Sequence, residues 1–231
     1  MCAKTTHASI SPQENSRGWG YLFFQLLVLP YLLSIISTLL PRPLSPAELN
    51  FAFYSINFIA IVIIFRTYLH ASARGALSRF WQILQAAILG LVAYEISNFL
   101  ITRTITHFFP GFTNVNDASI SAMTGSNFTL MAMGIVFLVP PVEEVLYRGM
   151  IFRRLYAVSR PAAYIVSIVI FGAIHVIGYI GKCTPGTLAL CFVQYIPAGV
   201  WLAWTCHKAD NILASIAVHA AINAIGLSIT R

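Results

Sequence analysis

Residues 128–149 read FTLMAMGIVFLVPPVEEVLYRG, and the segment carries no charged residue before Glu143. A helix of about 20 apolar residues crosses the hydrocarbon core of a bilayer, which is about 30 Å thick. The whole chain has this character, because 58% of its 231 residues are hydrophobic and only 9% are charged, with a mean hydropathy of +0.78. A soluble domain carries roughly 25% charged residues. The composition therefore excludes a soluble enzyme, a disordered chain and a disulfide scaffold.

Seven apolar segments are long enough to span a membrane as helices. They cover residues 20–40, 49–65, 80–101, 128–147, 162–180, 187–206 and 211–229. We therefore predict an all-α, polytopic transmembrane helix bundle of about seven spans. Its expected parts are a polar N-terminal tail (1–19), N-terminal transmembrane helices (20–127) and a C-terminal transmembrane core (128–231). The polar stretch 111–127 is the longest expected connection, and Pro140 and Pro141 are expected to interrupt the fourth span.

The basic residues indicate how the bundle is oriented. With the N-terminus in the cytoplasm, ten of the 14 Lys and Arg residues fall on the cytoplasmic side: Lys4, Arg17, Arg66, Arg74, Arg79, Arg148, Arg153, Arg154, Arg160 and Lys208. The other side holds Arg42, Arg103, Lys182 and Arg231. The positive-inside rule thus predicts a cytoplasmic N-terminus and an external C-terminus, most consistent with a bacterial plasma membrane. The net charge of +7 is scattered between apolar stretches, which argues against a nucleic-acid partner.

Ionisable side chains within apolar segments are the candidate functional residues, because burying such groups in a membrane is unfavourable. Only Glu95, Glu143, Glu144, His175 and His219 meet this criterion. Glu95, with Asn98 three residues later, could line a cavity or bond to a neighbouring helix.

Glu144 and Arg148 are four residues apart, so on a helix they share a face and can pair. Glu143 points about 100° away from Glu144. It therefore has no partner nearby in the sequence. A plain ion cluster at the end of a span would also explain this pattern.

Two further polar pairs stand on separate apolar segments. Phe171 and His175 are four residues apart, as are His219 and Asn223. Each pair alone could serve helix packing or interhelical hydrogen bonding. Three polar patches on three apolar helices all need partners inside the bundle, and we expect them to meet one another.

The three motifs EEVLYRG, FGAIH and HAAIN, in this order on successive apolar segments, resemble those of the CPBP family of CAAX proteases and bacteriocin-processing enzymes, also called the Abi family. This family includes the type II CAAX prenyl endopeptidases. The resemblance covers residues 139–225 and implies that 128–231 is a catalytic core of an intramembrane protease. It carries site roles to seven matching positions: Glu143, Glu144, Arg148, Phe171, His175, His219 and Asn223.

Peptide hydrolysis needs a held water, a base and donors for the oxyanion. We assign Glu143 as the base and His175 as a second holder of the water. Glu144 and Arg148 are expected to fix the helix, and His219 and Asn223 to donate to the oxyanion. We favour a glutamate-activated water without an obligatory metal. Zinc is the alternative, since Glu and His can bind it, although the chain lacks an HExxH motif.

The expected partners are a membrane-associated peptide or protein substrate and the lipid bilayer, with the oligomeric state left open. A bacteriocin immunity or interaction protein of the same fold is the alternative to an enzyme. A proton-coupled carrier is a third reading, but it predicts paired broken helices in two repeated halves. Only the break at Pro140 and Pro141 is expected here.

Overall fold

A computed structural model describes residues 8–229 of this protein. Over that range the chain is almost entirely helical, which confirms the predicted all-α bundle. The α-helices are α1 (Pro12–Leu27), α2 (Leu29–Leu39), α3 (Pro46–Ile64), α4 (Arg66–Ser78), α5 (Phe80–Phe108), α6 (Val115–Ser126), α7 (Phe128–Met133), α8 (Val139–Glu143), α9 (Arg153–Val158), α10 (Arg160–Val176), α11 (Pro185–Ala209) and α12 (Ile212–Ile229). Two π-helical segments, Gly134–Leu138 and Glu144–Phe152, and a short 3₁₀ turn, Ile177–Tyr179, complete the set.

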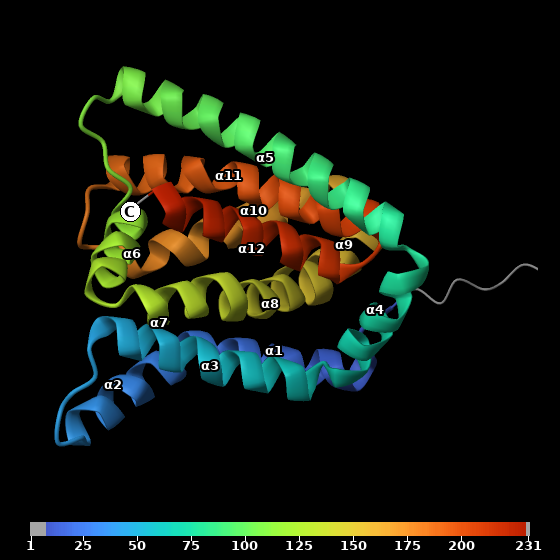
Figure 1. Ribbon diagram of the computed structural model, residues 1–231, viewed down its shortest axis with the longest axis horizontal. Helices are drawn as coiled ribbons and strands as arrows, with labels where there is room; N and C mark the ends of the chain where they lie inside the picture. Colours follow the sequence, from blue (N-terminus) through green and yellow to red (C-terminus); the bar gives the residue numbers. More distant parts are fainter. Residues whose placement is uncertain (1–7, 230–231) are drawn as a thin grey trace, which may run out of the picture.

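The long helices run alternately between two ends of the bundle (Figure 1). Helices α4 and α9 lie at one end, and α6 lies at the other. Each of the seven predicted segments is helical. Within residues 8–229, five helices are long and apolar enough to cross a membrane: Pro46–Ile64, Phe80–Phe108, Phe128–Val158, Arg160–Tyr179 and Pro185–Ala209. The pair α1 and α2 counts as a sixth if it forms one span, and α12 is a shorter apolar helix.

The first predicted span is bent. Helices α1 and α2 meet at an angle of 50°. Pro30 lies in the first turn of α2, where it can donate no backbone hydrogen bond to α1. The tail predicted at 1–19 is helical from Pro12, because Ser11 and Glu14 form a capping box. Such a box is readable in the sequence as Ser-Pro-x-Glu, and it recurs at the start of α3.

The expected break at Pro140 and Pro141 is wrong, because one helix continues from Phe128 to Val158. Immediately before the prolines the backbone widens into a π-helix, in which the N–H of Val139 donates to the carbonyl of Gly134. A proline ring normally collides with the carbonyl four residues before it. The π turn changes the spacing of those carbonyls, so two prolines fit without ending the helix.

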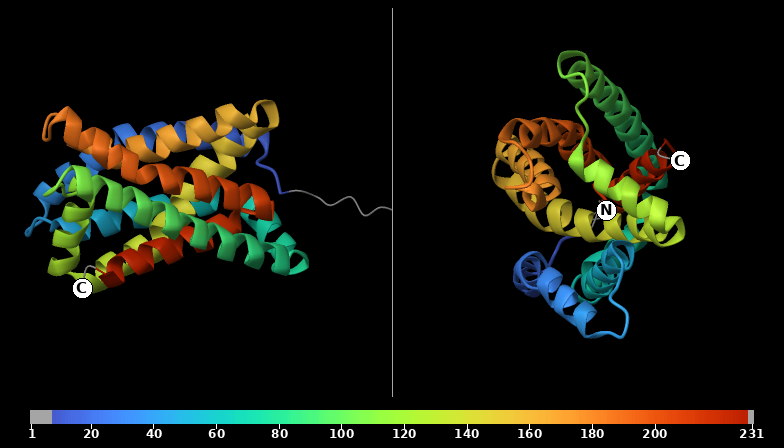
Figure 2. Two further views of the ribbon diagram at one scale, coloured as in Figure 1. Left: turned by 90° about the horizontal axis from the view of Figure 1, so that it is seen from above. Right: turned by 90° about the vertical axis from the view of Figure 1, so that its left-hand side faces the viewer.

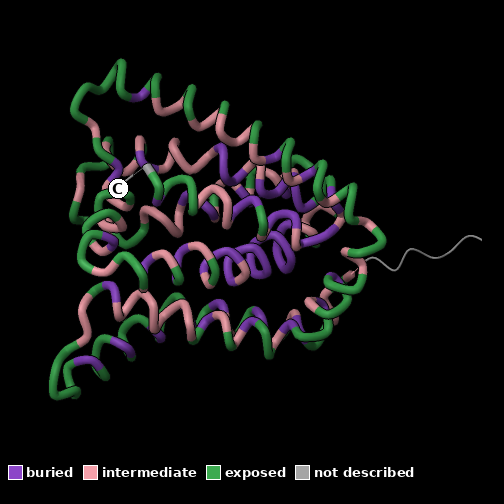
Figure 3. The backbone as a smooth tube through the Cα atoms, viewed as in Figure 1, coloured by how far each residue is buried: buried purple, intermediate pink, exposed green. Residues whose placement is uncertain are grey.

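This central helix is the core of the bundle. Every residue from 142 to 152 is buried (Figure 3), as expected for a helix surrounded by other helices. The α1–α3 group packs on one side of it, and α5 lies on the opposite side of the bundle (Figure 2). Helix α11 sits tightly against α10, since a Cβ atom at Gly199 would lie 2.7 Å from the Cα of Ile168. Such close approach through small residues is typical of membrane helices.

Candidate active site

The carboxylate of Glu144 links the central helix to α12. Its Oε1 accepts hydrogen bonds from Nη1 of Arg148 at 2.9 Å and from Nδ1 of His219 on α12 at 2.9 Å. Its Oε2 accepts one from the Ser215 hydroxyl, one turn before His219. Arg148 Nη2 also donates to the carbonyl of Ala198 on α11 at 3.2 Å. The predicted pairing of Glu144 and Arg148 is present, and neither side chain has any exposed surface.

Glu143 faces a different direction, as its position one residue before Glu144 predicts. Its Oε1 accepts a long hydrogen bond, 3.4 Å, from the hydroxyl of Tyr54 on α3. Its Oε2 is buried and has no hydrogen-bond partner within residues 8–229. A buried carboxylate oxygen without a donor is unfavourable until a donor arrives. Glu143 is therefore the acidic group of this site that is ready to accept a proton or a water hydrogen.

The proton of His175 is fixed by the backbone. Its Nδ1 lies 2.7 Å from the carbonyl oxygen of Phe171. A carbonyl only accepts, so Nδ1 carries the hydrogen, and in the neutral ring Nε2 is an acceptor. The ring also stacks on Tyr195 of α11, with centroids 4.2 Å apart and planes 25° apart. His175 is thus held on two sides.

Phe171 is the packing centre of the site. Its ring lies 4.5 Å from the guanidinium carbon of Arg148, a cation–π contact. The rings of His175 and His219 lie 4.6 Å and 5.7 Å from it, centroid to centroid. His175 and His219, one from each of the i, i+4 pairs on α10 and α12, therefore lie near the same aromatic ring.

His219 and Asn223 were both expected to donate to the oxyanion, but their hydrogen bonds differ. His219 donates its Nδ1 hydrogen to Glu144, so in the neutral ring its Nε2 accepts rather than donates. Donation to an oxyanion would require the doubly protonated ring. Asn223 uses one amide hydrogen on the carbonyl of Ile135 at 2.8 Å, and its amide nitrogen carries a second. Asn223 is therefore the better donor of the two.

Two cavities meet at these residues. One cavity, of about 330 Å³, is lined on one side by Tyr94, Asn98 and Thr102 of α5 and on the others by residues of α6, α10, α11 and α12. We call it the α5-side cavity. The other, of about 340 Å³, lies against α1 and α3, where Gln25, Asn50 and Tyr54 line it; we call it the α3-side cavity.

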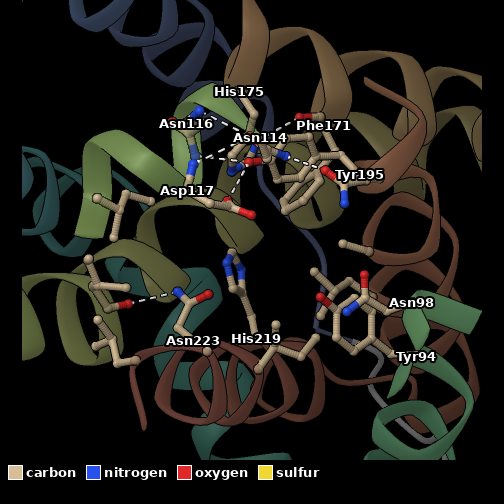
Figure 4. A pocket seen from close by; sticks show the side chains of 18 of the residues that line it. Tyr94, Asn98, Asn114, Asn116, Asp117, Phe171, His175, Tyr195, His219 and Asn223 are labelled. Atoms are coloured by element: carbon tan, nitrogen blue, oxygen red, sulfur yellow. Dashed lines mark hydrogen bonds between the residues drawn. The ribbon is translucent and has the colours of Figure 1, made fainter. Parts of the chain in front are cut away.

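Six residues line both cavities: Asn116, Ile120, Ile135, His175, His219 and Asn223. Glu143 lines the α3-side cavity. In Figure 4 the side chain of His219 points from α12 toward Asp117 on α6, and that of Asn223 donates to the carbonyl of Ile135.

Helix α6 forms a wall of both cavities, although the sequence indicated only a polar connection over 111–127. Asn114 caps it and donates to Gln194 at 2.9 Å. Asn116 donates to the hydroxyl of Tyr195 at 2.9 Å, and that hydroxyl donates to Asp117 at 3.1 Å. The N-cap Asn114 followed by Asp117 in the first turn is a helix-start signal that a closer reading could have found.

The surroundings of Asp117 shift the pKa of its carboxyl group. Partial desolvation raises the pKa of Asp117 above its ordinary value, and the hydrogen bond from Tyr195 acts in the opposite direction. The carboxyl lies beside the tyrosine that stacks on His175. It thus belongs to the surroundings of the site, and motif reasoning missed it together with Tyr54, Tyr195 and Ser215.

Glu95 lies apart from this arrangement. It lines neither cavity, whereas its neighbours Tyr94 and Asn98 line the α5-side cavity. The sequence left open whether Glu95 and Asn98 line a cavity or bond to a neighbouring helix. Of these two residues, Asn98 lines a cavity and Glu95 does not.

The donor types required for a metal are present without a matching geometry. Among residues 8–229, no three His, Cys, Asp or Glu side chains lie close enough together to hold an ion. Glu143, His175 and His219 line one cavity but do not form a three-ligand set.

Comparison with known proteins supports the reading of the motifs. Residues 125–225 match the model of the family described as Type II CAAX prenyl endopeptidase Rce1-like. No curated protein and no solved structure matches the chain. The matched segment contains all seven motif residues, and it begins just before α7 and ends within α12. The match to this family model therefore confirms the resemblance that the three motifs indicated for the C-terminal part of the chain.

Proposed function

We propose that this protein is an intramembrane endopeptidase that hydrolyses a peptide bond in a membrane-associated or hydrophobic substrate. The observation that carries the proposal is the buried, unpartnered Oε2 of Glu143 in a cavity that His175, His219 and Asn223 also line. A carboxylate, two imidazoles with acceptor nitrogens and an amide donor are suited to holding and activating one water.

The proposed reaction begins with a water that donates one hydrogen to Glu143 and another to Nε2 of His175. Glu143 removes a proton as the water oxygen attacks the scissile carbonyl carbon. The carbonyl oxygen becomes an oxyanion, which accepts a hydrogen bond from the free amide hydrogen of Asn223. Glu143 then returns the proton to the nitrogen of the scissile bond. The C–N bond breaks, and a carboxylic acid and an amine leave.

Glu144 and Arg148 support these groups without acting on the substrate. Glu144 fixes the ring of His219 through Nδ1, and Arg148 balances the charge of Glu144. Tyr54 donates to Oε1 of Glu143 and so orients Oε2 toward the cavity. The reactive oxygens are thus held before a substrate enters.

The site lies within the membrane-embedded bundle, which favours a substrate delivered by the bilayer. Candidate substrates are a lipid-modified C-terminus, a peptide pheromone and a bacteriocin leader. The end of the bundle that holds α4 and α9 is rich in arginine, so we assign it to the cytoplasm. Helix α1 begins at this end and α12 finishes at the other, in keeping with a cytoplasmic N-terminus and an external C-terminus in a bacterial plasma membrane.

Terminal proteomics of membranes tests the proposal. New protein termini should appear with the wild type and be absent with Glu143→Gln, which keeps an acceptor for Tyr54. Glu95→Gln is the matched control, because it alters a glutamate of a membrane helix that lines neither cavity. It should give the wild-type termini. Identical termini with wild type and Glu143→Gln would refute the assigned base. A non-enzymatic immunity protein would give no Glu143-dependent termini while still protecting cells from a bacteriocin.

A further inference from the structure

The α3-side cavity contains a second buried oxygen without a partner. Besides Oε2 of Glu143, the side-chain oxygen of Asn50 on α3 is buried and accepts no hydrogen bond within the described part of the chain. Both residues line this cavity. The water of the proposed mechanism accounts for Glu143 but leaves Asn50 without a donor.

A backbone N–H of a bound peptide would satisfy this oxygen. An extended chain presents a backbone N–H at every residue other than proline. Besides Asn50, the lining of this cavity includes the apolar side chains of Leu26, Phe53 and Met123 and the amide of Gln25. Such a lining receives apolar side chains while a few polar groups fix the backbone.

The two cavities lie on opposite sides of the catalytic residues. The α3-side cavity is bounded by α1 and α3, and the α5-side cavity by α5 and α11. These helices lie on opposite sides of the central helix (Figure 2). His175, His219 and Asn223 line both cavities, so a chain that occupies the two places one peptide bond at the catalytic residues.

We propose that the α3-side cavity is the binding subsite for the peptide chain on one side of the scissile bond, and that Asn50 accepts a hydrogen bond from a backbone N–H there. The α5-side cavity receives the chain on the other side. This inference rests on the proposed endopeptidase function. It adds a peptide-binding residue from α3, outside the segment that matches the family model.

Two variants of Asn50 test the proposal, and Asn15 supplies the control. Asn50→Leu and Asn50→Ala both remove the acceptor, the first with little change in volume. Asn15, on α1, also has a buried unpartnered side-chain oxygen, but it lines neither cavity. Each variant is compared with the wild type in membranes for the rate at which Glu143-dependent termini form. Its thermal stability in detergent is measured in parallel.

Both Asn50 variants should cut about tenfold more slowly, the size expected for one lost hydrogen bond to substrate. Asn50→Leu should be at least as stable as the wild type, because it removes a buried orphan oxygen. Asn15→Leu should keep the wild-type rate. Wild-type rates in both Asn50 variants would overturn the subsite, as would an equal loss of rate in Asn15→Leu. A loss of rate that follows a loss of stability in both Asn50 variants would also overturn it. If the wild type itself forms no Glu143-dependent termini, the endopeptidase proposal fails, and the subsite with it.

Discussion

His219 and Glu144 are joined through the imidazole Nδ1 and the carboxylate Oε1, 2.9 Å apart, although 75 residues separate them in the chain. The same carboxylate holds Arg148. One buried acidic group therefore fixes both the ring that faces the cavity and the cation behind it. The motif residues therefore fall into two groups. Some, such as His219, line the cavities, whereas Glu144 and Arg148 line neither and hold the others in place.

Removal of Arg148 should destabilise the bundle strongly. Arg148→Ala leaves Glu144 charged, buried and without its cation, and breaking one partner of a buried ion pair costs about 3–5 kcal/mol. Replacing both residues, with Glu144→Gln and Arg148→Met, should recover part of that loss. Reversible unfolding in mixed micelles measures both effects. Wild-type stability of Arg148→Ala would contradict the pairing.

Tyr195 should affect activity through the stack on His175 rather than through its hydroxyl. Tyr195→Phe keeps the ring beside His175 and loses the hydrogen bonds to Asn116 and Asp117. Tyr195→Leu loses both. We expect a several-fold lower rate of forming Glu143-dependent termini for Tyr195→Leu and a smaller decrease for Tyr195→Phe. Equal effects of the two variants would assign the role to the hydroxyl.

Asp117 should make stability depend on pH. Partial desolvation raises the pKa of Asp117 above its ordinary value of 3.8, so the folded protein binds this proton more tightly than the unfolded chain does. The resulting stabilisation is complete below the ordinary pKa and is lost as pH rises through the raised pKa. Asp117→Asn keeps an oxygen for Tyr195 and should remove this component. Thermal denaturation across acidic pH, for wild type and variant, checks it. Parallel curves would refute the assignment.

Gly199 should tolerate no side chain. A methyl group at this position would lie 2.7 Å from the Cα of Ile168, so α10 and α11 would have to separate. We expect Gly199→Ala to lower the free energy of unfolding by about 1–3 kcal/mol, as overpacking does. Because α10 carries His175, cleavage should slow as well. Gly20→Ala is the control, since nothing lies within 4 Å of its added methyl. Equal stability of the two variants would contradict the close packing.

Chelation should separate the two candidate chemistries. Glu143, His175 and His219 line one cavity but do not form a three-ligand set. Enzyme that has been extensively chelated and analysed for metal should therefore keep forming Glu143-dependent termini. Activity lost on chelation and restored by zinc would instead favour the metal reading.

Local patterns in the sequence were sufficient for the bundle and for half of the site. Apolar length gave the seven helical segments, and i, i+4 spacing predicted the contact between Glu144 and Arg148. The helix break predicted at Pro140 and Pro141 was wrong, because residue types alone do not indicate that a π turn precedes them. Tyr54 and Asn50 on α3 could not be found, since neither stands near a motif. Their relation to Glu143 exists only after α3 packs against α8.

The π turn at Gly134–Leu138 affects the direction in which the side chain of Glu143 points. A π turn amounts to one residue inserted into an α-helix, and each residue advances the helix by about 100°. If the same residues were wound as an ordinary α-helix, without the wide turn, Glu143 would be rotated by about that angle relative to α7. The carboxylate would leave its present line to Tyr54 with every functional side chain still in the chain. The direction of the Glu143 carboxylate therefore depends on how that turn is wound as well as on which residues form it.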